Sequence, residues 1–413
     1  MRIYMLIVWI ALALQSSNVF AERLLMKNAT LMTMGAEGTL EGADLFIEDG
    51  EIRAMGIDLQ ATADTVIDVA GATVTPTLFA GATAIGLVEV NAVKESVDSS
   101  LNNSPLGKVH IEFDVRDAYS PHSSLVGITR VEGYGYSLLM ANGAEYSVSG
   151  IGSLVELDGR FDSFSGNDTL FIDVDGYSSG KVGGSRAAHW MLLEGMMSDL
   201  DRRPDSQEYL TQAGRKQLKE LRSDGVFVFA ANRAADIKQV INFTEKHRLS
   251  SVVIGAREAW MLASQLADSG IAVMVNGLDN LPADFDSLGS RLDNAAILND
   301  TGVTVMFTSG GTHNARKVRQ GAGTAVAYGM NYMSALRAMT VVPSQIFGGR
   351  DRAIKVGNST DLVVWSGDPL EITSHATAVI MAGQVTSMET RQSKLLERYL
   401  PEKPSLGRAY INR

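Results

Sequence analysis

Seven apolar runs of strand length, alternating in several places with helical stretches, constrain the fold of this chain more than any other feature. The runs cover residues 77–84, 136–141, 170–174, 225–229, 251–254, 271–275 and 303–307. The helical stretches cover 185–222, 234–247, 258–269, 287–299, 314–330 and 331–346. Strands that are apolar throughout are buried on both faces, and their alternation with helices is typical of a parallel sheet. The pattern predicts an α/β fold.

The length of this alternating region favours a (β/α)8 TIM barrel. Such barrels need roughly 250 residues, which is close to the span of 76–350. Residues 150–157 are the candidate for the eighth strand or for a surface hairpin. A doubly wound open sheet is the alternative. No G-x-G-x-x-G or G-x-x-x-x-G-K-[ST] motif follows a strand, which weakens the nucleotide-binding form of that alternative.

Both ends of the chain contain short strand-like segments. Residues 23–75 are predicted to form a run of short strands, since residues 24–34 alternate loosely and Asp49-Gly50 is typical of a hairpin turn. A small antiparallel sheet cannot bury a core alone, so it needs partners, and residues 361–365 and 378–381 are strand-like. We therefore predict a composite β-sandwich of 22–75 plus 355–388, a barrel domain of 76–354, and a C-terminal tail of 389–413. The first half of the tail is consistent with an amphipathic helix.

The first 21 residues have the layout of a secretory signal peptide. Arg2 precedes an apolar run of 12 residues, and Val19 and Ala21 suit a cleavage site after Ala21. An uncleaved membrane anchor is the alternative, although the run is shorter than the ~20 residues that span a bilayer. The chain contains no cysteine and carries a net charge of −11. We expect a periplasmic or secreted protein that has no membrane attachment after cleavage and does not bind nucleic acid.

Two segments carry a family resemblance. Residues 66–90 read VIDVAGATVTPTLFAGATAIGLVEV, and residues 307–380 include SGGTHNARKVRQG and TDLVVWSGDPL. Both segments resemble the amidohydrolase superfamily, in particular the imidazolonepropionase-like exported amidohydrolases. The resemblance covers nearly the whole chain after the signal sequence. It implies a metal-dependent TIM barrel flanked by a β-sandwich that both chain ends build.

The positions that hold metal in that family lack donor atoms in this chain. The resemblance places the two histidines of an H-x-H motif at Ala82 and Ala84, a third histidine at Ala230, and an aspartate at Ser309. A catalytic zinc needs about three protein ligands, and an alanine side chain supplies none. Zinc is the cofactor that the family implies, but we predict no metal and no other cofactor at these degenerate positions.

Other residues remain as candidates for chemistry or binding. Ser309 and His313 follow the last strand and are the catalytic candidates, although a tight loop for Ser309 and a helix-capping loop residue for His313 are the favoured interpretations. Five charged residues are expected near the carboxyl ends of the barrel strands. They form either an ion network in the emptied site or contacts to a zwitterionic or carboxylate ligand. These residues are Glu89, Arg130, Glu132, Arg233 and Glu258.

Two functions from different classes remain. The first is a pseudoenzyme that binds a small-molecule ligand or serves as the inactive partner of an active amidohydrolase paralogue, in a homo- or hetero-oligomer. The second is an active hydrolase of C–N bonds, other than the peptide bonds of proteins, with a rebuilt or metal-free site. The quoted positions offer no group that holds a metal to activate water, so the sequence favours the pseudoenzyme.

Overall fold

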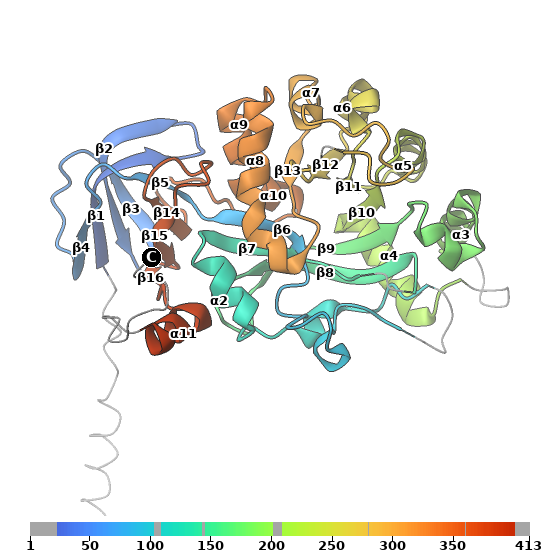
Figure 1. The fold of residues 1–413 in the computed structure, drawn as a ribbon, viewed down its shortest axis with the longest axis horizontal. Coiled ribbons are helices and arrows are strands. Elements are labelled where there is room, and N and C mark those ends of the chain that lie inside the picture. The colour runs from blue at the N-terminus through green and yellow to red at the C-terminus, as the bar shows by residue number, and fades with distance from the viewer. Residues whose placement is uncertain are drawn as a thin grey trace, which may run out of the picture.

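Two eight-stranded sheets lie side by side along the long axis of the molecule (Figure 1). The computed structural model describes residues 23–102, 109–142, 145–200, 209–279, 281–359 and 361–400. The predicted signal sequence of residues 1–21 and the last part of the predicted tail lie outside these residues.

One sheet forms the barrel, and its strands follow one another in chain order. Adjacent strands are parallel except for β8, which is antiparallel to both β7 and β9. All seven predicted strands are present, and residues 150–157 belong to the eighth, β8, as part of a hairpin rather than a further βα unit. The strands are β6 Leu78–Thr83, β7 Tyr134–Leu139, β8 Val148–Glu156, β9 Phe164–Asp173, β10 Val226–Ala231, β11 Ser251–Gly255, β12 Ala272–Val275 and β13 Val305–Phe307.

The barrel is nearly closed by packing between its first and last strands, since β6 and β13 end the path of paired strands. Gly81 has a φ of +84°, and a Cβ atom there would lie 2.9 Å from Thr308 Cα. The Ala84 N–H also donates to Thr312 Oγ1 at 3.0 Å. Glycine is required at 81 because the backbones approach closely and φ is left-handed.

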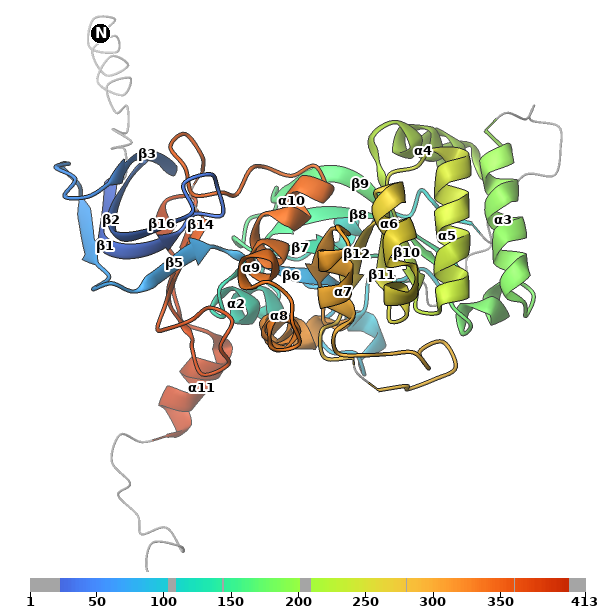
Figure 2. The same cartoon turned by 90° about the horizontal axis from the view of Figure 1, so that it is seen from above.

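Helices cover the outside of the barrel (Figure 2). Apolar side chains fill its interior. Several predicted helical stretches are divided in the structure; 185–222, for instance, contains α3 and α4 with a break between them. The interior is lined by Phe79, Tyr136, Leu154, Phe171, Val228 and Met274 among others. The helices are α2 Ser124–Arg130, α3 Arg186–Ser198, α4 Gln212–Asp224, α5 Ala234–His247, α6 Ala263–Ser269, α7 Asn294–Asp300, α8 Val318–Ala327, α9 Tyr332–Thr340 and α10 Val342–Ile346.

The second sheet combines strands from both ends of the chain, as predicted, in the order β16-β15-β14-β5-β1-β2-β3 with β4 paired to β1. Asp49 and Gly50 both have positive φ, which fits the predicted hairpin turn. The finer prediction of a sandwich stays a prediction. The strands are β1 Arg23–Met32, β2 Thr39–Glu48, β3 Glu51–Gly56, β4 Thr65–Asp68, β5 Thr73–Pro76, β14 Asp361–Trp365, β15 Ala376–Met381 and β16 Gln384–Val385.

An ion network joins this sheet to the barrel. Arg350 Nη2 lies 3.1 Å from Glu156 Oε2 and also contacts Asp361. Arg352 Nη1 lies 3.4 Å from Asp361 Oδ2, and its Nη2 contacts Glu156. The Arg352 guanidinium also stacks 3.5 Å from the centre of the Tyr136 ring. Glu156 ends β8 and Asp361 begins β14, so the network connects the two sheets.

The predicted amphipathic helix of the tail is present as α11 Arg391–Tyr399, and none of its residues is buried. Residues 401–413 are outside the described part of the chain. No helix in the described part has the length and apolar character needed to cross a bilayer.

Candidate functional site

The carboxyl ends of the parallel barrel strands, which are all except β8, meet at one end of the barrel, where TIM-barrel folds place their sites. Ala82 and Ala84 lie there, 1% and 7% exposed, within the apolar cluster of the interior. Ala230 is half-buried and follows Val228 by two residues, so it lies on the same interior face. These positions therefore continue the apolar filling of the barrel into its mouth.

The metal that the resemblance implies does not fit the donors present. Methyl groups occupy three of the four inherited positions, and the hydroxyl of Ser309 donates to the Gly311 carbonyl at 3.0 Å. Within the described ranges, no three His, Asp or Glu side chains are grouped in a way that could hold a metal ion. A cavity at the ends of β11 and β12 has a volume of about 10 Å³, which is room for about one water.

One carboxylate lies at the mouth beside an inherited position. Asp173 ends β9, is paired in register with Ala230, and follows interior-facing Phe171 by two residues. Burial raises the pKa of Asp173, the nearby Asp175 carboxylate raises it further, and Lys181, 3.5 Å away, lowers it. Asp173 is therefore a partly buried acid with a proton affinity above that of an exposed carboxylate.

The hydroxyls of Ser147 and Ser178, which both donate to the Asp173 backbone carbonyl, also enclose the ring of His189. His189 Nδ1 is 3.0 Å from Ser147 Oγ, and Nε2 is 3.2 Å from Ser178 Oγ. Its side chain is fully buried, and burial lowers its pKa, which favours the neutral ring. Both ring nitrogens have partners, so His189 connects β8, the loop after β9 and α3 as a structural residue.

Ion pairs form the rim of the mouth. Arg186 Nε at the start of α3 lies 3.0 Å from Asp236 Oδ2 of α5, and Arg186 Nη2 contacts Asp286. Arg257 Nη2 lies 2.9 Å from Asp279 Oδ2. These pairs cross-link the loops that follow different strands. Ion pairs are thus present at this end of the barrel, and residues other than the five charged candidates make them.

Two predicted candidates meet at another part of the rim. His313 Nε2 lies 3.2 Å from the Glu89 carbonyl oxygen, and the Glu89 carboxylate accepts hydrogen bonds from the backbone N–H and the hydroxyl of Ser124. His313 belongs to a short 3-10 helix of Thr312–Lys317 and is exposed. Glu89 thereby connects the first and last units of the barrel with α2. The catalytic role of Ser309 and His313 stays a prediction.

Glu258 and Arg233 occupy the start of α5. Both oxygens of the buried Glu258 carboxylate accept from the backbone, from Ala234 N–H at 2.9 Å and from Gly289 N–H at 2.8 Å. Arg233 precedes the helix and is exposed. Glu258 thus caps α5, because a carboxylate at a helix N-terminus satisfies free N–H groups there.

Arg130 and Glu132 are not at the barrel mouth, contrary to their expected position. Arg130 ends α2, and Glu132 lies just before β7 starts at Tyr134. Residues between a helix and the next parallel strand lie at the amino ends of the strands, which is the opposite end of the barrel. Arg130 Nη1 donates to the Leu157 carbonyl at 3.2 Å. Their predicted role in ligand binding is separate from this placement and stays a prediction.

Sequence reasoning missed the acid Asp173 and the rim arginines Arg186 and Arg257. The signal for Asp173 was its place at the last position of a buried strand, although the DVDG segment that it begins is also typical of a turn. The two arginines precede helical stretches and give no sign of their partners, since Asp286 and Asp279 belong to distant loops.

The inherited positions differ in the space around them, which predicts different responses to histidine. Ala82→His is expected to cost about 1–3 kcal/mol, because it overpacks a filled interior. Ala230→His is expected to cost less than about 1 kcal/mol, because Ala230 is half-buried at the mouth. Guanidinium unfolding of both variants measures the difference. Equal costs would contradict the closed interior at Ala82.

Comparison with known proteins supports the fold. No protein-family model matches the chain, and no curated protein matches it. The crystal structure of an amidohydrolase from Thermotoga maritima MSB8 aligns with a TM-score of 0.78 and 19% identity, covering 88% of this chain and 99% of that chain. A molinate hydrolase aligns with a TM-score of 0.55 and 14% identity over 89% of this chain and 95% of its own.

An adenosine deaminase from Xanthomonas campestris with bound zinc aligns with a TM-score of 0.54 and 14% identity, covering 88% of this chain and 92% of that chain. At identities this low, the alignments show a shared fold alone. The chain therefore has the fold of solved amidohydrolase structures, over nearly the full length of each.

Proposed function

We propose that this chain is an exported pseudoenzyme of the amidohydrolase superfamily, of the imidazolonepropionase-like kind, which binds a small-molecule ligand or pairs with an active paralogue. The observation that carries the proposal is the apolar character of the inherited metal positions. Ala82 and Ala84 belong to the buried interior cluster, and Ala230 continues it at the mouth. The fold is that of amidohydrolases, whereas the donors for a metal centre are missing at these places.

The missing donors argue against catalysis because the family's reaction needs a metal ion to activate water. In metal-dependent hydrolysis, a bound ion lowers the pKa of water to about 7 and polarises the substrate carbonyl. Alanine methyl groups can do neither. The rim ion pairs Arg186–Asp236 and Arg257–Asp279 hold the loops in place without a metal. A rigid mouth of this kind suits binding or docking to another chain.

The location and assembly of the protein belong to the same proposal. The segment of 1–21 supports export to the periplasm or beyond. The combined sheet of both chain ends is proposed to fold as the β-sandwich of the family. Partners are a small-molecule ligand and an amidohydrolase paralogue in a homo- or hetero-oligomer.

Metal content tests this proposal directly. Protein purified from the periplasm of an expression host, without chelator or metal-affinity resin, is expected to contain far less than about one zinc, iron or manganese per chain. Elemental mass spectrometry measures the content, and unfolding with and without a chelator is expected to give the same midpoint. A stoichiometric metal that the chelator removes with a loss of stability would overturn the pseudoenzyme.

A second function is favoured by Asp173. Asp173 lies beside Ala230, and burial raises its pKa, so its carboxylate accepts a proton more readily than an exposed one, as a general base must. We propose as the alternative a metal-free hydrolase of C–N bonds other than the peptide bonds of proteins. Hydrolysis of N-acyl amino acids that Asp173→Asn abolishes, and that Glu220→Gln on the exposed face of α4 leaves in place, would establish this alternative.

A further inference from the structure

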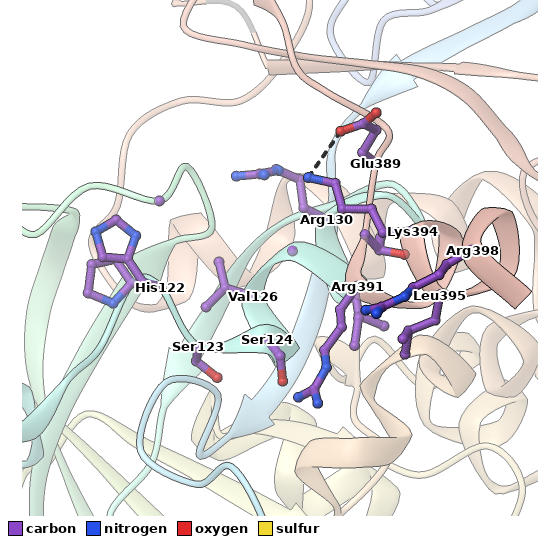
Figure 3. A pocket seen from close by; sticks show the side chains of 15 residues that line it. His122, Ser123, Ser124, Val126, Arg130, Glu389, Arg391, Lys394, Leu395 and Arg398 are labelled. Carbon is purple, nitrogen blue, oxygen red and sulfur yellow. Dashed lines mark ion pairs between the residues drawn. The ribbon is translucent and has the colours of Figure 1, made fainter.

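A cavity of about 510 Å³ lies on the outer side of the barrel, between α2 and α11 (Figure 3). Its walls come from residues 121–130 and 389–398, together with Gly159. Pockets for small molecules commonly have volumes of about 300–1,000 Å³. None of the described residues that line it belongs to the apolar cluster of the barrel interior, so this cavity is distinct from that interior, although Ser124 in its wall also contacts Glu89 at the rim of the mouth.

The charge of this cavity is opposite to that of the chain. Arg130, Arg391, Lys394 and Arg398 line it, against one carboxylate, that of Glu389. Glu389 Oε2 lies 3.2 Å from Lys394 Nζ, so one carboxylate is engaged by one ammonium. The chain as a whole carries a net charge of −11. A local excess of cations in such a chain costs energy through mutual repulsion unless an anion offsets it.

The guanidinium groups retain free donors. Arg130 Nη1 donates to the Leu157 carbonyl, while Arg130 Nε is buried and makes no hydrogen bond within the described structure. In the same described ranges, Arg391 and Arg398 form no ion pair, and Arg398 lies 5.4 Å from the centre of the Tyr399 ring. Figure 3 shows Arg391 and Arg398 reaching from α11 toward the wall that α2 forms.

The remaining polar side chains of the cavity are occupied or neutral. Ser123 Oγ accepts from the Leu125 N–H at 3.3 Å, and Ser124 Oγ donates to Glu89 at 2.9 Å. The His122 ring packs against the Phe161 ring, with 5.3 Å between centres. The free chemistry of the cavity is therefore that of guanidinium groups, which bind carboxylate and phosphate oxygens through paired N–H donors.

We propose that the cavity between α2 and α11 binds a small multivalent anion, one that carries at least two phosphate or carboxylate groups. The spread of guanidinium groups over two facing helices requires more than one anionic group to engage both walls. Such an anion is either a free metabolite or the headgroup of an anionic lipid. The second source is relevant because Leu396 and Tyr399 of α11 are 59% and 70% exposed beside the cations. Anion binding here does not depend on what the barrel mouth does.

Calorimetric titration with pyrophosphate and with citrate tests the free anion. We expect binding by the unaltered protein, and a loss of about tenfold or more in affinity in the double variant Arg391→Gln, Arg398→Gln. Both residues are exposed and α11 has no buried residue, so the variant retains its fold. The matched control is Lys219→Gln, Arg222→Gln on the exposed face of α4, which also removes two positive charges and is expected to change affinity less than about twofold.

Flotation with vesicles tests the lipid source. Binding to phosphatidylglycerol vesicles but not to phosphatidylcholine vesicles, lost in the α11 double variant, would identify a lipid headgroup as the anion and support the site. Equal losses in the α11 and α4 double variants would reveal unspecific attraction and overturn it. Failure of both free anions and of the anionic vesicles to bind would also overturn it. None of these results bears on metal content, so the proposed function stands or falls separately.

Discussion

Asp361→Asn is expected to lower the free energy of unfolding by about 3–5 kcal/mol, because it removes one carboxylate from a buried ion network. Asp361 contacts Arg350 and Arg352, and its side chain is 6% exposed. The Arg352 side chain is 3% exposed and stacks on Tyr136, so it cannot turn to water. Glu156 then faces two guanidinium groups alone. Urea unfolding with an unchanged m-value measures the loss.

The control for this prediction is a variant that breaks a solvent-exposed ion pair. Glu220→Gln on α4 breaks a contact of 3.9 Å with Lys216; the two side chains are 56% and 80% exposed. Its cost is expected to stay below about 0.5 kcal/mol, since exposed pairs contribute little. A cost below about 1 kcal/mol for Asp361→Asn would show that the arginines find other partners, and that the network does not hold the two sheets together.

Gly81→Ala is expected to destabilise the protein by about 3 kcal/mol or more, through two causes that add. A left-handed φ costs an alanine about 1–2 kcal/mol. The new Cβ atom would also lie 2.9 Å from Thr308 Cα, and backbone cannot yield as a flexible side chain does. The change therefore opens the contact that closes the barrel between β6 and β13.

A second glycine separates the two causes. Gly71 has the same φ of +84° with nothing within 4 Å of the position of a Cβ atom. Gly71→Ala is expected to lower the free energy of unfolding by about 1–2 kcal/mol, which is the cost of the left-handed φ for an alanine without any steric clash. Equilibrium unfolding of both variants in guanidinium gives the difference. If the two costs agree, close packing at Gly81 does not stabilise the barrel, and closure must rest on other contacts.

Much of the fold could be predicted because it depends on the local periodicity of apolar residues. Apolar runs such as 226–229 and 251–254 are strands whose side chains are all or nearly all buried, which their apolar sequence indicates directly. The Asp49-Gly50 turn is a property of neighbouring residues, and so is α11. The antiparallel direction of β8 was not predictable in this way, since a buried strand has the same pattern in either direction.

In the candidate site, too, some features follow from the sequence and others only from the packing. The lack of donors at Ala82, Ala84 and Ala230 is a property of the sequence, given the resemblance that identifies these positions. Which residues lie next to these positions cannot be read from the sequence. The pairing of Ala230 with Asp173 follows from the register of β9 and β10, which depends on how their faces pack.

The order of the amino acids alone accounts for the alternation of strands and helices, the pairing of both chain ends, and the loss of metal donors. Three-dimensional packing was needed to show that the barrel closes at Gly81 and Thr308, that Arg352 is enclosed between the sheets, and that Arg130 faces the helix of Arg391. The physical reason is distance along the chain. Local patterns set which face of an element is apolar, but many arrangements bury the same faces, and only the packing of distant side chains selects one.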